Sequence, residues 1–183
     1  MGRPLRTPPS SWIDEGLRAL AEGGPGAVRV EALARALGVT KGGFYNHFDN
    51  RPALLDEMLD TWEAVGVDQP IEQVEMDGGD ARAKLRRLFD IGASSLDLVE
   101  IDLAIRDWAR RDRAVAERLR RVDNRRMEYL RLLFAEFTAD PHEIETRCLI
   151  AFSLFIAPAR IAADHGSLSQ ADVRERALSQ LLD

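Results

Sequence analysis

The sequence predicts an all-α protein in which a small three-helix N-terminal head joins a larger helical-bundle body. Apolar residues recur at three- and four-residue spacing along most of the 183 residues, which is the period of an amphipathic helix. No sustained alternation of β-branched and polar residues favours a strand. Between Gly66 and Asp80 the helical pattern fades into Pro, Gln, Gly and acidic residues, which is typical of a join. We therefore expect a head over residues 1–62 and a body over residues 63–183.

The first helix is expected to begin at Ser11, because Ser11 and Asp14 form an S-x-x-D capping pattern. The sequence GGPG at residues 23–26 should end it. Pro52 suits the first turn of a fourth helix that starts after Asn50 and connects the head to the body. The remaining head helices are expected at about residues 30–37 and 41–48.

Helical spacing resumes in the body, where Asp112 is expected to cap a long helix. Asp140 and Pro141 should open another helix, which reaches about Ala163 and is apolar on nearly every side in its middle. Such a helix needs a second layer of helices to cover it. Pro158 should kink it or remove one backbone hydrogen bond. A last helix is expected after a cap formed by Ser169 with Asp172.

The composition restricts the classes of function. The formal net charge of -6 argues against a protein that coats nucleic acid non-specifically, because such binding needs many Lys and Arg. A local basic footprint is still present, since Arg3, Arg6, Lys41 and Arg51 flank or lie within residues 30–49. The sequence contains no apolar run of about 20 residues, so neither a membrane span nor a secretory signal is predicted. We therefore expect a cytoplasmic protein without membrane contact.

The most informative segment is VEALARALGVTKGGFYNHFD, residues 30–49. It predicts two short helices joined by a turn in which Gly38 adopts a positive φ. Thr40 is placed to cap the second of these helices, whose solvent face would present Lys41, Gly42, Tyr45 and Asn46. The residues expected to pack these helices against the first helix are Leu33, Leu37, Val39, Phe44 and Phe48.

The sequence resembles the TetR family of transcription regulators. The matching residues are dense from Trp12 to about Leu55, a range that includes this segment. The residues that carry the resemblance are Leu33-Ala34, Leu37-Gly38-Val39-Thr40, Tyr45-Asn46-His47-Phe48 and Arg51-Pro52-Ala53-Leu54. The body resembles the family only in length and helical layout. The resemblance implies a helix-turn-helix domain that binds duplex DNA, in a repressor that a small molecule releases from its operator.

Carried over residue by residue, the resemblance implies phosphate contacts for Thr40, Tyr45, His47 and Arg51. Lys41, Gly42 and Asn46 would then lie nearest the base edges, with Lys41 favouring guanine and Asn46 adenine. Arg29 stands where a Ser or Thr cap is usual, and it would reach a phosphate. Gly42 and Gly43 are poor helix formers. They either let the backbone approach DNA closely or leave this helix partly ordered until DNA binds.

One head reads only a few base pairs, so a palindromic operator calls for a homodimer. The helix from Pro141 and the last helix are the expected interface, with Ile150, Leu154, Ile161, Val173 and Leu181 as candidate contacts. Bulky or polar groups that interrupt aliphatic stripes are candidates for an effector pocket in the body: Trp62, Phe89, Trp108, Arg126, Tyr129 and Phe152. An inward Arg126 would need an anionic partner, such as Asp102, Asp107 or a ligand carboxylate.

The alternative is a DNA-binding regulator whose body binds a protein partner or no ligand. An enzyme is not expected, because no nucleophile stands near a base, and no phosphate loop is present. No catalytic residue, cofactor or metal site is predicted. The single cysteine, Cys148, has no histidine at metal-ligand spacing and is expected to pack in the core.

Overall fold

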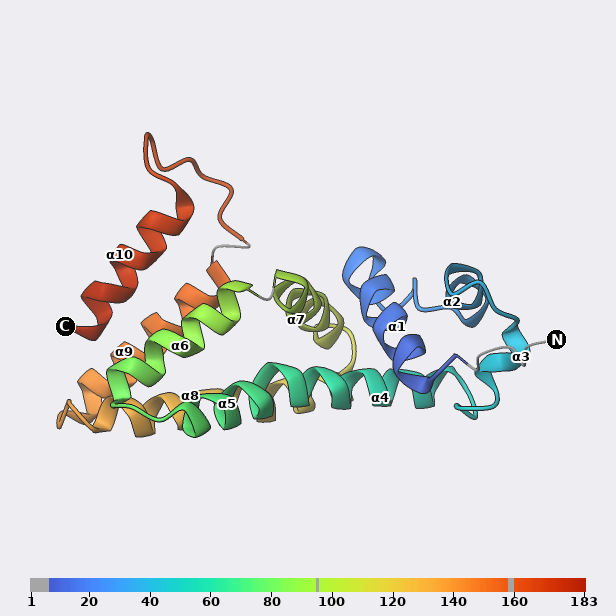
Figure 1. The fold of residues 1–183 in the computed structure, drawn as a ribbon, viewed down its shortest axis with the longest axis horizontal. Helices are drawn as coiled ribbons and strands as arrows, with labels where there is room; N and C mark the ends of the chain where they lie inside the picture. Colours follow the sequence, from blue (N-terminus) through green and yellow to red (C-terminus); the bar gives the residue numbers. More distant parts are fainter. Residues whose placement is uncertain (1–6, 95, 158–159) are drawn as a thin grey trace. The chain divides into compact units, whose positions relative to one another are not determined.

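The computed structural model describes residues 7–94, 96–157 and 160–183. Every regular element in these ranges is a helix, which confirms the all-α prediction (Figure 1). None of the helices in these ranges is long and apolar enough to span a membrane. Arg3, Arg6 and Pro158, which carried sequence-based expectations, lie outside the described residues.

The helices pack into two compact units. We call the first the head unit; it runs to Gly66 and also contains Glu100–Leu119. We call the second the body unit; it contains Val67–Val99 and Arg120–Asp183. The head unit thus includes the end of one later helix and the start of the next, as well as the N-terminal segment. The functional boundary predicted after residue 62 stays a prediction.

The N-terminal helices of the head unit correct two of the predicted bounds. The first helix begins before Ser11, with Pro8 as its N-cap residue and no side-chain cap, because the fixed φ of Pro9 suits a first helical position. The predicted helix over residues 41–48 ends after one turn, and residues 45–47 form turns. The four helices are α1 (Pro9–Gly23), α2 (Val30–Ala36), α3 (Lys41–Phe44) and α4 (Arg51–Glu63).

The segment expected as an unpatterned join is helical over most of its length. A π-helical turn, η1 (Ala64–Asp68), follows α4, and α5 (Gln69–Asp77) comes next. Pro70 lies in the first turn of α5, where its missing N–H costs no hydrogen bond, and Val74 is buried. The chain then leaves the helix through Gly78 and Gly79, whose φ angles are 67° and 99°. Such positive angles favour glycine.

The later helices begin largely where the caps predict. Asp112 Oδ1 accepts hydrogen bonds from the backbone N–H of Ala114 and Val115, and Asp140 accepts one from His142. Ser169 and Asp172 form the predicted reciprocal capping box. The bounds are α6 (Ala81–Ser94), α7 (Leu96–Ala109), α8 (Arg113–Ala135), α9 (Pro141–Ile156) and α10 (Gln170–Leu182). The helix α9 therefore ends before Ala163, where we had expected it to end.

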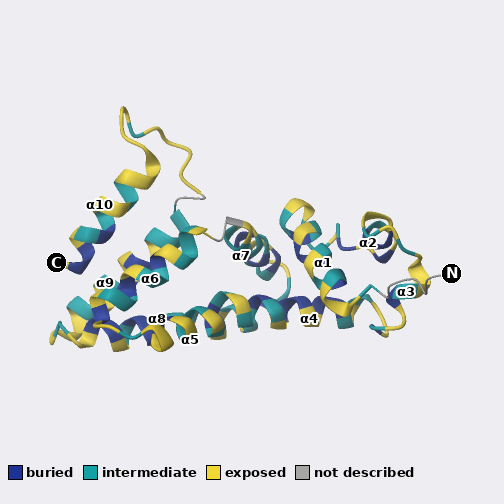
Figure 2. Cartoon of the chain, in the orientation of Figure 1, coloured by how far each residue is buried: buried dark blue, intermediate teal, exposed yellow. Residues whose placement is uncertain are grey.

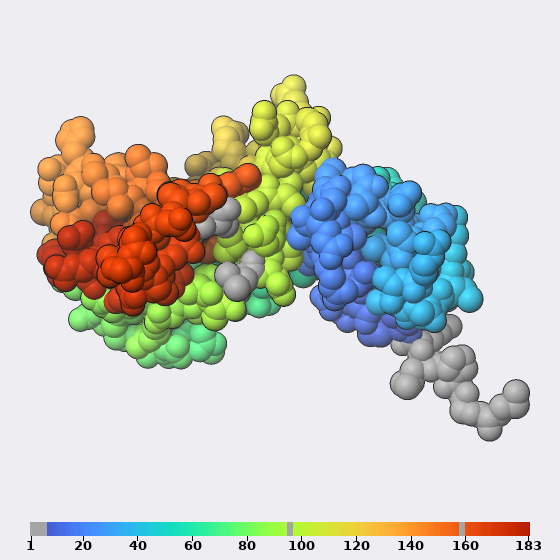
Figure 3. All heavy atoms as spheres, turned by 90° about the horizontal axis from the view of Figure 1, so that it is seen from above, coloured from blue at the N-terminus to red at the C-terminus, as the bar shows by residue number. Residues whose placement is uncertain are grey.

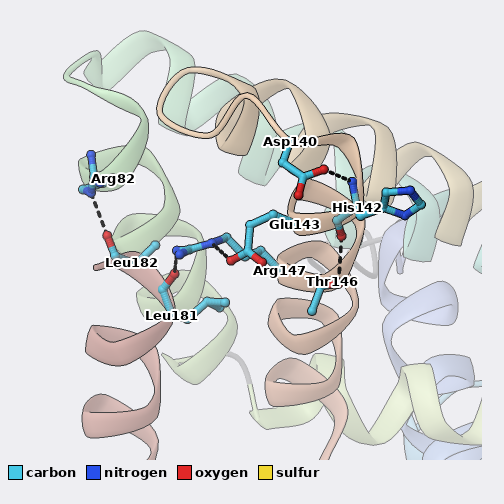
Figure 4. Close-up of polar contacts among 8 residues, drawn as sticks. All are labelled: Arg82, Asp140, His142, Glu143, Thr146, Arg147, Leu181 and Leu182. Carbon is cyan, nitrogen blue, oxygen red and sulfur yellow. Dashed lines mark hydrogen bonds and ion pairs between the residues drawn. The ribbon is translucent and has the colours of Figure 1, made fainter.

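The core of the body unit is formed by α6, α8, α9 and α10. Leu85, Leu133, Phe134 and Leu182 are at most 2% exposed, and Cys148 is fully buried in the same cluster, as predicted. The C-terminal end of α10 is held by two arginines (Figure 4). Arg82 Nε on α6 donates to the Leu182 carbonyl oxygen at 2.6 Å. Arg147 on α9 donates to the Leu181 carbonyl oxygen, so the free carbonyls of the last turn gain partners.

Candidate nucleic-acid interface

The turn between α2 and α3 has the conformation that the sequence predicts. Gly38 has a φ of 67°, a region that favours glycine because a side chain there would be strained. The Val39 N–H donates to the Ala34 carbonyl oxygen at 2.9 Å, which closes the end of α2. The turn therefore directs the chain from α2 into α3 within four residues.

Aromatic packing fixes α3 on the rest of the head unit. The Phe44 side chain is fully buried. Its ring centroid lies 5.4 Å from the ring centroid of Trp12 in an edge-on arrangement and 5.2 Å from that of the stacked Phe48 ring. Such aromatic pairs add about 0.5–1.5 kcal/mol beyond the area that they bury. Leu33, Phe44 and Phe48 are buried as predicted, whereas Leu37 and Val39 are only partly buried.

With Phe44 buried, α3 and the turn after it present a continuous exposed edge. We call Thr40, Lys41, Gly42, Tyr45 and Asn46 the reading edge; all five residues are exposed. The Tyr45 side chain is 54% exposed, and its ring meets Phe44 edge-on at 5.2 Å. Thr40 occupies the N-cap position of α3, but its hydroxyl makes no capping hydrogen bond. The compact head formed by α1 to α3 is drawn in blue shades in Figure 3.

Two residues expected to contact DNA phosphates are engaged with the protein's own backbone. Arg51 Nε donates to the Val28 carbonyl oxygen at 2.5 Å, and its Nη2 donates to the Pro25 carbonyl oxygen. His47 Nε2 lies 2.9 Å from the Thr7 carbonyl oxygen. Arg29, by contrast, is exposed at the N-cap position of α2 and makes no capping hydrogen bond with its side chain.

Glu31 of α2, which no sequence motif singles out, lies beside the exposed edge, with its Oε1 2.5 Å from Lys41 Nζ. The hydrogen bond between them lowers the pKa of Glu31 and raises that of Lys41. Both groups are therefore charged at neutral pH. The only sign of this pair in the sequence is the opposite charge of the two residues. They are ten positions apart on different sides of a turn, so the spacing of charges along one helix does not predict the contact.

The residues predicted to line an effector pocket are divided between the two units. Trp62 and Trp108 belong to the head unit; Phe89, Arg126, Tyr129 and Phe152 belong to the body unit. The Trp62 indole N–H donates to buried Asp102, which also pairs with Arg106 at 2.7 Å. Figure 2 colours each helix by burial, with buried residues in dark blue and exposed residues in yellow.

Arg126 lies close to an acidic residue of its own helix, α8, and to an aromatic ring of α9. Arg126 Nη1 lies 3.5 Å from Asp123 Oδ1, and its side chain is only 10% exposed. Its guanidinium carbon is 5.7 Å from the centre of the Phe155 ring, within range of a cation–π interaction. Tyr129 donates a 2.6 Å hydrogen bond to Glu75, and burial is the main cause that raises the pKa of Tyr129. These partners tie α8 to its neighbours in the body unit.

Residues of α9 and α10 line an open groove of about 300 Å³. It includes three of the candidate dimer contacts, because Ile150, Leu154 and Leu181 line it. Ile150 is 45% exposed and its neighbour Leu149 is 62% exposed. Ile161 is also exposed, but it lies in the loop after α9. The complete lining is Glu143, Thr146, Arg147, Ile150, Leu154, Ala177, Gln180 and Leu181.

Comparison with known proteins supports the interpretation of the head. Residues 13–58 match the family model for bacterial regulatory proteins of the tetR family. This range contains α2 and α3 and most of α1 and α4. No curated protein matches the chain.

Solved structures share the fold over nearly the whole chain. A transcriptional regulator from Rhodococcus sp. Rha1 is 20% identical, with a TM-score of 0.72 over 96% of this chain and 94% of its own. AibR, solved with isovaleryl coenzyme A and operator DNA, is 14% identical, with a TM-score of 0.72 over 95% and 97%. FadR from Bacillus subtilis, solved with stearoyl-CoA, is 15% identical, with a TM-score of 0.69 over 95% and 97%.

The solved structures extend the likeness of fold to the body, whereas the family itself rests on the matched head. Residues 13–58 carry the glycine turn, the buried aromatic anchor and the exposed edge of α3. Over residues 13–58 the chain is similar to bacterial regulatory proteins of the tetR family, and its fold is that of the solved transcriptional regulators.

Proposed function

We propose that the chain is a repressor that binds a palindromic operator as a homodimer and is released by a small-molecule effector bound in its body. The observation that carries the DNA-binding part is the reading edge. Its five exposed residues lie on the short helix α3 and directly beside its two ends, and Phe44 and Trp12 hold this helix in place. A rigid helix with an exposed polar edge suits entry into the major groove.

The proposed contacts divide by chemistry. The hydroxyl groups of Thr40 and Tyr45 donate to phosphate oxygens and position the head. The Asn46 amide suits the N6 and N7 edge of adenine, and the Lys41 ammonium suits the O6 and N7 edge of guanine. Arg29, which is exposed, would add a phosphate contact.

The homodimer is supported by the exposed apolar residues of α9. Leu149 and Ile150 are large side chains left partly in water, and Ile150 lines the groove against α10. A twofold dimer would bury this surface on the same surface of a second copy. Two heads would then read two half-sites about one helical turn apart, roughly 34–36 Å.

An effector in the body is supported by the similar structures. AibR and FadR were solved with acyl-coenzyme A molecules, so acyl-CoA thioesters are the first compounds to test. In this proposal the effector binds the DNA-free geometry of the dimer more tightly than the DNA-bound geometry, because only such a difference in affinity can shift the equilibrium.

Two substitutions test the DNA contacts. Tyr45→Ala should weaken binding to every duplex sequence, because a phosphate contact carries no sequence information. Asn46→Ala should instead relax the preference at one position of each half-site by about 1–3 kcal/mol. Footprinting on the DNA upstream of the chain's own coding region supplies the operator. Equal losses on all sequences for both variants would contradict the assignment.

Release by the effector is tested by titrating short- and long-chain acyl-CoA thioesters into the protein–operator complex. The expected result is dissociation of DNA together with an increased melting temperature of the free protein. If neither changes over a broad set of metabolites while DNA binding persists, the body binds a protein partner or no ligand.

A further inference from the structure

An ion pair bridges the two helices of the helix-turn-helix. Glu31 is the second residue of α2 and Lys41 is the first residue of α3. Glu31 Oε1 and Lys41 Nζ lie 2.5 Å apart, with 61% and 50% of the respective side chains exposed. Because Lys41 belongs to the reading edge, the Glu31 carboxylate lies beside the surface that would face DNA.

The pair approaches DNA with a net charge near zero. The two pKa shifts show that the contact favours the charged form of each partner, since the pKa of Glu31 falls and that of Lys41 rises. Non-specific binding to duplex DNA is driven by cations that neutralise phosphates and release counterions. A lysine that is already neutralised by its own carboxylate contributes little to this driving force.

A phosphate and a base pair would meet this ion pair differently. A phosphate oxygen bound to the Lys41 ammonium would lie roughly 5 Å from the Glu31 carboxylate, within one Debye length at about 0.1 M salt. The two like charges would repel each other. A G·C pair instead presents the O6 and N7 acceptors of guanine beside the N4 donor of cytosine. Lys41 complements the guanine edge and Glu31 complements the cytosine amino group.

We propose that Glu31 is a specificity-determining residue that makes Lys41 a reader of a G·C base pair and prevents it from anchoring phosphates. The inference rests on the proposed DNA-facing role of the reading edge. It assigns a DNA-reading role to the start of α2, in addition to α3. It also gives the acidic residue a purpose at a surface that binds a polyanion.

The first experiment measures binding to a short random-sequence duplex as a function of salt. Glu31→Gln should bind this duplex about five- to tenfold more tightly near 0.1 M salt, and the slope of log K against log[salt] should steepen by about 0.9, the value for one added phosphate contact. The matched control is Glu57→Gln, which removes the same charge from an exposed position of α4. The control should leave the slope unchanged.

A double-mutant cycle separates an effect through Lys41 from a general effect of charge. In the wild-type background, Lys41→Gln should change the slope of log K against log[salt] little. In the Glu31→Gln background, the same substitution should make the slope shallower by about 0.9, because one phosphate contact is lost. If Glu31→Gln matches Glu57→Gln, or gains the same affinity without Lys41, the inference is wrong. Circular dichroism melts confirm that each variant is folded.

The second experiment selects preferred sites from a pool of random duplexes. The wild-type protein should select G·C at one position of each half-site, and Glu31→Gln should lose that selection while retaining preferences at other positions. An unchanged preference at every position overturns the inference even when the wild-type protein binds DNA. No salt-dependent binding of the wild-type protein to any duplex would overturn the DNA-binding function itself, and this inference with it.

Discussion

Arg51, which the family resemblance assigns to a phosphate contact, hydrogen-bonds to the protein's own backbone. Its guanidinium donates to the Val28 and Pro25 carbonyl oxygens and so ties the start of α4 to the loop between α1 and α2. Arg51→Ala leaves both acceptors without this donor, and we expect the free energy of unfolding to fall by about 1–3 kcal/mol. Arg51→Lys should restore only part of the loss, because an ammonium lacks the fork geometry. Urea unfolding followed by circular dichroism measures both.

Arg35→Ala is the control for charge, since Arg35 is exposed on α2 and should change stability little. A structural role would be contradicted if Arg51→Ala left the free energy of unfolding unchanged. In that case the slope of log K against log[salt] for DNA binding should become shallower by about 0.9, the value for one lost phosphate contact.

Cys148 should make the free energy of unfolding decrease as the pH becomes alkaline. Burial, with a smaller effect of the Glu145 carboxylate, raises the pKa of the Cys148 thiol from 9.0 to about 11. The unfolded chain therefore loses this proton before the folded chain does. The contribution is complete below about pH 9 and is lost as pH rises towards 11, by up to about 1.4 kcal/mol per pH unit.

Urea unfolding of the wild-type protein and Cys148→Ala at about pH 8 and pH 10.5 tests this dependence. The wild-type protein should lose more stability between the two pH values than Cys148→Ala does. Comparing the two proteins matters because the pKa of Tyr129 is raised as well. Identical pH dependence in both proteins would show that the thiol makes no such contribution.

The helix α3 is short, and a substitution of Gly42 tests whether this glycine weakens the helix. An added Cβ at Gly42 would lie 3.8 Å from its nearest neighbour, Thr40 Oγ1, so no packing requires glycine there. Gly42→Ala should raise the free energy of unfolding by up to about 1 kcal/mol because alanine favours the helix. We also expect it to weaken DNA binding, since the methyl group would stand on the reading edge between backbone and DNA.

The matched control is Gly26→Ala, because Gly26 lies in the loop before α2 and an added Cβ there would meet no atom within 4 Å. Thermal melts and binding to a short duplex measure both variants. Tighter DNA binding by Gly42→Ala would indicate instead that the glycine pair merely leaves α3 incompletely ordered.

At the level of the assembly, the proposed homodimer would bring two heads together through the surface of α9. Ile150 is 45% exposed and lines the groove beside α10, so Ile150→Glu would place a charge in the proposed interface. We expect this variant to be a monomer in sedimentation velocity, with operator affinity reduced at least tenfold, about 1.4 kcal/mol. Burying an unpaired carboxylate opposes association.

Met76→Glu is the corresponding control, since Met76 is 78% exposed on α5 and does not line the groove. It should leave the oligomeric state unchanged. A wild-type protein that sediments as a single chain, or an Ile150→Glu variant that is still dimeric, would rule out this interface.

Much of the helical layout follows from neighbours in the sequence. Gly38 takes the predicted positive φ, and Asp112, Asp140 and Ser169 cap the predicted helices. These features depend on residues within about four positions of each other, so local spacing encodes them. The helical structure of residues 64–77 was harder to predict, because Pro and Gln interrupt the apolar stripe of this segment.

The sequence alone determined the all-helical class, the turn at Gly38 and the aromatic residues that hold α3. Only the tertiary structure decided that Lys41 meets Glu31, that Arg51 binds backbone carbonyls and that Ile150 lines a groove with α10. The physical reason is range. Turns and caps are set by nearby backbone geometry, whereas contacts between elements depend on how packed helices orient long side chains, which a periodic pattern leaves unspecified.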